Sequence, residues 1–234
     1  MNLTALANCV QDWLKKEDVV VNHGLMREGF LAVPIVNHFL SDGRLGRIEL
    51  ERLYPEVLQK SKDRRNWIAM DMAVFEKQSQ KLSFAIEAKW ANQNRCFKDE
   101  FYAEAFRLAA LHRCGTRTCC LLVAGEMAHI VGVFDTTVRS RLVRGWKSPA
   151  FTSFPYKVEH KKGIVKVGDI IGFGFASRAL ERSGLGTYVD LIHLRVEVRE
   201  SWCVGNGPEM GLIIWKVWTP KSTPWIKRQE VTNG

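Results

Sequence analysis

The sequence predicts an α/β (α+β) protein built around a mixed central sheet. Helix and strand patterns follow one another in the order helix, strand, strand, strand, helix, strand. The helix between the third and fourth strands can cross over the sheet, so these two strands are expected to run parallel. Beyond about Trp146 the chain is rich in strand patterns separated by glycine-containing turns. We therefore divide the chain into a core, residues 1–144, and a β-rich basic extension, residues 145–234.

The chain opens with two helical patterns and a strand. Leu3–Leu14 is a short amphipathic helix, and Gly24–Leu40 is a second helix that ends at the turn-forming SDG sequence of residues 41–43. Pro34 should kink the second helix or mark its true start, because proline cannot donate the helical hydrogen bond. Arg47–Tyr54 alternates like a half-exposed strand, with a helix as the competing interpretation.

The clearest local pattern is an antiparallel hairpin. Its strands are Trp67–Glu76 and Leu82–Trp90, joined by the polar sequence KQSQK. Phe97–Leu111 then has apolar residues at helical spacing, and Thr118–Ala124 is a short apolar run typical of a buried strand. These segments complete the predicted core.

The N-terminus and the cysteines predict an intracellular, cytoplasmic protein. The first 18 residues form an interrupted amphipathic pattern, unlike a signal peptide or a membrane span, so no membrane partner is expected. The six cysteines lack CxxC spacing, which fits reduced thiols. His112, Cys114 and Cys119 suggest zinc, but their spacing is not that of a zinc site.

Positive charge is concentrated in the second part of the chain. Of a formal net charge of +9, residues 137–234 carry sixteen Lys and Arg against eight Asp and Glu, while residues 1–136 carry eighteen against seventeen. A one-sided basic surface suits a polyanionic partner such as nucleic acid. Solubility, or an anionic membrane surface, would explain the same excess.

Ionisable residues interrupt the apolar hairpin. Side chains alternate across a strand, so Asp71 shares a face with Ala69 and Ala73, and Glu87 shares a face with Lys89. Two neighbouring carboxylates in a sheet need a compensating cation. Phosphodiester hydrolysis can be catalysed by a divalent metal held by carboxylates, with a lysine that orients or deprotonates the attacking water. A cross-strand salt-bridge cluster on a solvated face is the competing interpretation.

Asp71, followed across the hairpin by Glu87-Ala88-Lys89, resembles the D…ExK signature of the PD-(D/E)xK nuclease superfamily. The order αβββαβ of that restriction-endonuclease-like fold is also the order predicted above. The resemblance implies that Asp71 and Glu87 bind Mg²⁺ or Mn²⁺, that the Ala88 carbonyl is a further ligand, and that Lys89 serves the attacking water. It covers residues 24–124, and it departs from the literal motif at Met70, where the family has proline.

Many members of the superfamily add a glutamate from the first core helix. Glu28 is our candidate for this catalytic and metal-binding role, with Glu49, Glu51 and Glu56 as alternatives. A carboxylate in the first turn of a helix also simply complements the helix dipole.

Further residues are candidates for contacts with nucleic acid. Lys62, Arg64 and Arg65 precede the Asp71 strand and could contact the phosphate backbone, unless they only form a solvated loop. Tyr102 matches a tyrosine of some exonuclease branches, although a core aromatic is the competing interpretation. The tryptophans of the extension could stack on bases or be buried in its sheet: Trp202, Trp215, Trp218 and Trp225.

Together these patterns predict a Mg²⁺-dependent endonuclease acting on double-stranded DNA, in which the core cuts and the basic extension holds or reads the duplex. Cutting both strands would require two active sites, hence a homodimer or a partner subunit. The alternatives are a non-catalytic nucleic-acid-binding or assembly protein with a nuclease-like fold, and a nuclease acting on RNA, single strands or branched DNA.

Overall fold

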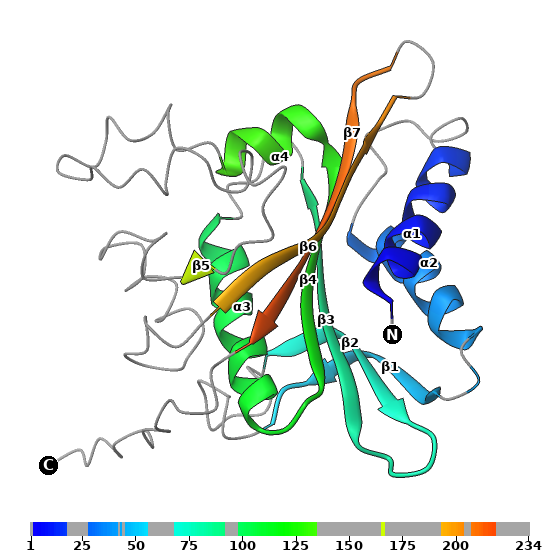
Figure 1. Ribbon diagram of the computed structural model, residues 1–234, viewed down its shortest axis with the longest axis vertical. Coiled ribbons are helices and arrows are strands. Elements are labelled where there is room, and N and C mark those ends of the chain that lie inside the picture. The colour runs from blue at the N-terminus through cyan, green and yellow to red at the C-terminus, as the bar shows by residue number, and fades with distance from the viewer. Residues whose placement is uncertain are drawn as a thin grey trace, which may run out of the picture.

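In the computed structural model, the described residues form a seven-stranded sheet with helices on both faces (Figure 1). The structure describes residues 2–17, 28–41, 43, 45–55, 68–91, 98–134, 165–166, 193–203 and 207–218. The order of the described strands is β1-β2-β3-β4-β7-β6-β5; among them β3 and β4 run parallel, and the other neighbouring pairs are antiparallel. The predicted α+β class is therefore confirmed. Among the described residues, no helix has the length and apolarity needed to cross a membrane.

The elements of the core follow in the predicted order, and one additional helix, α4, comes after them. Their bounds are α1 Leu3–Glu17, α2 Glu28–Leu40, β1 Leu45–Leu53, β2 Ala69–Glu76, β3 Leu82–Ala91, α3 Lys98–Arg113, β4 Thr118–Glu126 and α4 Met127–Phe134. The segment predicted as either strand or helix is thus strand β1. Pro34 lies inside α2 rather than at its start.

The crossover prediction is confirmed by the pairing of β3 with β4. These strands run parallel, from Phe84 opposite Thr118 to Ala91 opposite Gly125, with α3 connecting them. Both strands are buried almost throughout because helices cover both faces of the sheet. This explains why Thr118–Glu126 is a continuous apolar run instead of an alternating one.

Helices α1 and α2 cover one face of the sheet, and α3 and α4 cover the other (Figure 1). Leu6 and Val10 of α1, and Leu31 and Ile35 of α2, recur at a spacing of four residues and are fully buried. They pack in one cluster with Met72, Val74, Ile86, Leu122 and Ile214 of the sheet. Each such side chain contributes about 1.5–3 kcal/mol on burial. The opposite face, under α3, is the one on which the polar residues gather.

The described strands of the extension continue the same sheet. They are β5 Val165–Lys166, β6 His193–Trp202 and β7 Met210–Trp218, and β7 pairs antiparallel with β4. Trp202 and Trp215 are buried, as the burial interpretation expected, whereas Trp218 is half-buried and Trp225 lies outside the described residues. The boundary between residues 144 and 145, and the role of the extension, stay predictions.

Candidate active site

The candidate site forms where main-chain pairing between β2 and β3 ends. The register runs from Phe75 opposite Leu82 to Met72 opposite Ile86. Asp71 and Glu87 are the next residues along the two strands. Met72 and Ile86 pack into the core under α1 and α2. Alternation therefore turns Asp71 and Glu87 to the α3 side.

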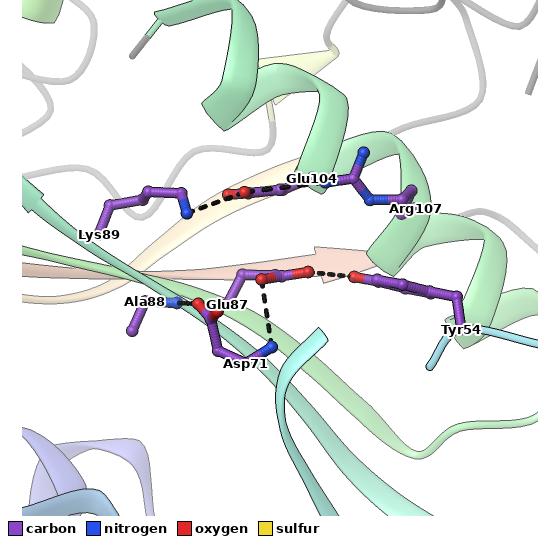
Figure 2. A network of polar contacts seen from close by, with 7 residues as sticks. All are labelled: Tyr54, Asp71, Glu87, Ala88, Lys89, Glu104 and Arg107. Atoms are coloured by element: carbon purple, nitrogen blue, oxygen red, sulfur yellow. Dashed lines mark hydrogen bonds and ion pairs between the residues drawn. The ribbon is translucent and has the colours of Figure 1, made fainter. Parts of the chain in front are cut away.

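Side chains replace the main-chain hydrogen bonds at this point (Figure 2). The N–H of Ala88 donates to Oδ2 of Asp71 at 2.7 Å, and the N–H of Asp71 donates to Oε2 of Glu87 at 3.4 Å. Each carboxylate is thus held against the backbone of the opposite strand. The structure brings the two acidic side chains of the predicted motif together on one face, with Asp71 partly exposed.

Glu87 is almost completely enclosed, with 2% of its surface exposed. The Tyr54 hydroxyl donates to its Oε1 at 2.5 Å. Burial, followed by the negative charges of Glu104 and Asp71, raises the pKa of Glu87 well above its ordinary value, although Arg107 and the Tyr54 hydrogen bond act in the opposite direction. The ionised form of the Glu87 carboxyl group would therefore be stabilised by a nearby cation.

Lys89 lies two residues further along β3, on the same face. Its Nζ is 2.9 Å from Oε1 of Glu104 in α3, and both side chains are less than one-tenth exposed. Arg107, one helical turn along α3, approaches the same oxygen at 3.7 Å. Burial raises the pKa of Glu104 to about 7, while Lys89 and Arg107 hold it lower than burial alone would.

Arg107 connects the two halves of this cluster. Its guanidinium carbon lies 5.5 Å from the centre of the Tyr54 ring, at the range of a cation–π contact. Tyr54 in turn contacts Glu87. Burial, and then the charge of Glu87, raises the pKa of the Tyr54 hydroxyl well above its ordinary value, so it remains a hydrogen-bond donor. Figure 2 shows the network of β2, β3, α3 and the end of β1.

The other glutamates proposed for the site lie elsewhere or outside the described side chains. Glu28 is the first residue of α2, whose helix covers the opposite face of the sheet, and its side chain is not described. Glu49 is engaged with Arg47 and Arg52 at 2.8 Å each. Glu51 is a strand residue with a φ of 54°. Glu56 lies outside the described residues, so a metal role for these glutamates stays a prediction.

The predicted phosphate contacts, Lys62, Arg64 and Arg65, also lie outside the described residues. Tyr102 belongs to α3, but its side chain is not described. In the described part of the chain, no group of three or more His, Cys, Asp or Glu side chains is arranged to hold a metal.

Sequence patterns did not single out Tyr54, Glu104 and Arg107. Glu104 and Arg107 are charged residues in a stretch of α3 where every described residue from Phe101 to Leu111 is buried. An acid and a base three residues apart within such an apolar stretch were the available signal, since charged residues are rarely buried unless paired. Tyr54 had no comparable signal, because its contact with Glu87 exists only once β1, β2 and β3 have paired in the sheet.

Comparison with known proteins gives no relative from which a function could be transferred. No family model, no curated protein and no solved structure matches the chain. The chemistry of this protein is therefore inferred from the side chains of the site.

Proposed function

We propose that the protein is a metal-dependent DNA endonuclease of the restriction-endonuclease-like class, hydrolysing phosphodiester bonds. The observation that carries this proposal is the convergence of Asp71 and Glu87 across the open end of the β2–β3 ladder, with Lys89 on the same face. The order α2-β1-β2-β3-α3-β4 supports it, because it is the αβββαβ order of the class that the motif resembles. One fold serves many functions, so the side chains of the site carry more weight here than the order of elements.

The donor chemistry of the site fits Mg²⁺ or Mn²⁺. Mg²⁺ is commonly held by one or two carboxylates together with water and substrate oxygens, so Asp71 and Glu87 would suffice. Within a strand, the N–H and C=O of one residue point to the same edge, so the Ala88 carbonyl faces the Asp71 side as its N–H does. The raised pKa of Glu87 fits a group whose ionised form a cation would stabilise. Bound there, the metal would activate water and offset charge on phosphorus.

The protein's own groups then have distinct roles. Asp71 and Glu87 would hold the cation, and the backbone contacts to each carboxylate fix their orientation before it binds. The Lys89 ammonium would orient the attacking water or stabilise charge on the phosphate. The formal net charge of +9 supports a polyanionic substrate such as DNA.

One observation favours a second candidate function, that of a non-catalytic nucleic-acid-binding or assembly protein with this fold. Both carboxylate oxygens of Glu87 already accept hydrogen bonds, from the Tyr54 hydroxyl and the Asp71 N–H. Such a group can be satisfied without any metal.

A plasmid-cleavage assay separates the two functions. Supercoiled plasmid is incubated with wild type, Asp71→Asn and Lys89→Ala, with and without Mg²⁺ or Mn²⁺. The matched control is Asp12→Asn, because Asp12 is an exposed acid of α1 on the opposite side of the sheet. Metal-dependent cutting by wild type and control is expected, with cutting lost in Asp71→Asn and strongly reduced, but still measurable, in Lys89→Ala. Salt-sensitive plasmid binding without cutting by wild type would support the second function instead.

A further inference from the structure

The lysine of the motif does not extend freely from β3. Lys89 is 6% exposed, and its ammonium group lies 2.9 Å from Glu104 Oε1 (Figure 2). A lysine side chain has a flexible four-carbon stem, so holding its charge at one point requires fixed partners. The partner here comes from α3, the helix that connects β3 to β4.

Glu104 is itself fixed by its surroundings. Arg107 approaches the same oxygen at 3.7 Å, and Arg107 also lies over the ring of Tyr54, which contacts Glu87. Helix α3 therefore contacts Lys89 directly through Glu104, and it is linked to Glu87 through Arg107 and Tyr54. A displacement of α3 would move the environment of Glu87 and Lys89 together.

Stability alone is a poor explanation for this buried cluster. Within the described residues, Oε2 of Glu104 and Nε of Arg107 are buried and have no hydrogen-bond partner. Taking such charges out of water costs more than a well-packed apolar set would, so buried ion pairs seldom add net stability. A role in fixing the position of the Lys89 ammonium group explains why the chain retains this buried ion pair.

We propose that Glu104 is a positioning residue for Lys89, keeping its ammonium group at the face where Asp71 and Glu87 meet. This inference rests on the proposed nuclease function. Glu104 acts through Lys89, and it neither replaces Asp71 or Glu87 nor contacts the DNA. Displacing a reacting group by about 1 Å can lower a rate about 100-fold, so removing Glu104 should act mainly on kcat.

The test measures kcat, KM for DNA and the Mg²⁺ concentration giving half-maximal rate. The variants are Glu104→Gln, which retains an acceptor oxygen but no charge, Glu104→Ala and Glu104→Asp. Glu76→Gln is the matched control, because Glu76 lies at the hairpin end of β2 and contacts Ser79 instead of the site. Lys89→Met is measured alone and combined with Glu104→Gln. Circular dichroism and thermal melting identify any variant that fails to fold.

If Glu104 positions Lys89, kcat falls about 100-fold in Glu104→Ala and less in Glu104→Gln, while KM and the Mg²⁺ requirement change by less than about threefold. Glu104→Asp recovers part of kcat because it keeps the charge. In the Lys89→Met background, Glu104→Gln has no further effect.

Two results would overturn the inference while leaving the nuclease function intact. One is a folded Glu104→Gln or Glu104→Asp variant with the kcat of the Glu76→Gln control. The other is an equal loss from Glu104→Gln whether residue 89 is Lys or Met, because the effect would then not pass through Lys89. Absence of metal-dependent cleavage by folded wild type would instead refute the proposed function, and this inference with it.

Discussion

The Tyr54 hydroxyl donates a 2.5 Å hydrogen bond to Oε1 of the buried Glu87, joining the end of β1 to the centre of β3. The two residues are 33 positions apart in the sequence. This contact partly offsets the burial of Glu87, whose pKa would otherwise be raised further.

Tyr54→Phe should destabilise the fold by about 1–3 kcal/mol, because it leaves a buried carboxylate oxygen without its donor. Urea unfolding followed by circular dichroism measures this loss. Ser79→Ala, which removes an exposed hydrogen bond to Glu76, is the control and should change the free energy of unfolding by less than about 0.5 kcal/mol. Equal values for the two variants would show that the Tyr54 contact does not stabilise the native state.

Stability should fall as the pH rises from about 4.5 to about 7. Burial raises the pKa of Glu104 in the folded protein from its ordinary value of 4.5 to about 7. The folded state thus binds more protons than the unfolded state in this window, and stability present below pH 4.5 is lost as the pH rises through about 7. The full effect is on the order of 3 kcal/mol. Glu87 contributes in the same direction.

Urea unfolding of wild type and Glu104→Gln between pH 4 and 8 measures this dependence. The variant should be less sensitive to pH than wild type, since glutamine does not titrate. Glu76→Gln serves again as the control, and it should retain the wild-type slope. Identical pH profiles for wild type and Glu104→Gln would mean that Glu104 has the same pKa in the folded and unfolded states.

Divalent cations should stabilise the protein through Asp71. If Mg²⁺ binds only the folded state, 100-fold excess over its dissociation constant adds about 2.7 kcal/mol and raises Tm. Differential scanning fluorimetry across a Mg²⁺ titration tests this without any substrate. The rise should disappear in Asp71→Asn and persist in Asp12→Asn. A rise of equal size in both variants would place the ion somewhere else.

Trp215→Ala should cost about 3–5 kcal/mol, because it removes a large, fully buried side chain of β7. The Trp215 ring packs edge-on against Phe101 of α3, with centroids 5.0 Å apart. The loss in the free energy of unfolding therefore reports whether β7 of the extension unfolds cooperatively with the core. Leu50→Ala on β1, where the side chain is 52% exposed, is the control and should cost much less. If Trp215→Ala has only a small effect on unfolding of the core, the core and the extension do not unfold as one cooperative unit.

Gly125→Ala should destabilise the end of β4. Gly125 has a φ of 147°, and a Cβ there would lie 2.4 Å from the Ala91 carbonyl oxygen, far inside contact distance. We expect a loss of more than about 1 kcal/mol in the free energy of unfolding. Gly29→Ala in α2 is the control, because its Cβ would meet nothing within 4 Å and alanine favours helix. Equal stability of the two variants would mean that β4 relaxes at no cost.

Several structural features follow from local patterns in the sequence. The hairpin of β2 and β3 was predicted because strands alternate with a period of two and a polar turn joins them. The same alternation placed Asp71, Glu87 and Lys89 on one side. The parallel β3–β4 pair followed from the helix between them, since a parallel connection needs a long crossover.

Other features depend on contacts between distant segments. The addition of β7 beside β4 could not be predicted, because an apolar strand pattern does not specify its neighbour. Helix α4 was not predicted, since its eight residues are too few for a clear period. The face of the sheet that α2 covers, opposite the site, also had no local signal.

Local sequence patterns are enough to predict the fold class, the hairpin and the side of that hairpin on which Asp71, Glu87 and Lys89 lie. These follow from backbone geometry, which acts over a few residues. That Tyr54, Glu104 and Arg107 surround these residues follows from the packing of distant elements and is seen only in the folded structure. The reason is that the free energy of a buried charge depends on partners supplied by other elements, and those partners meet only when the sheet and α3 pack together.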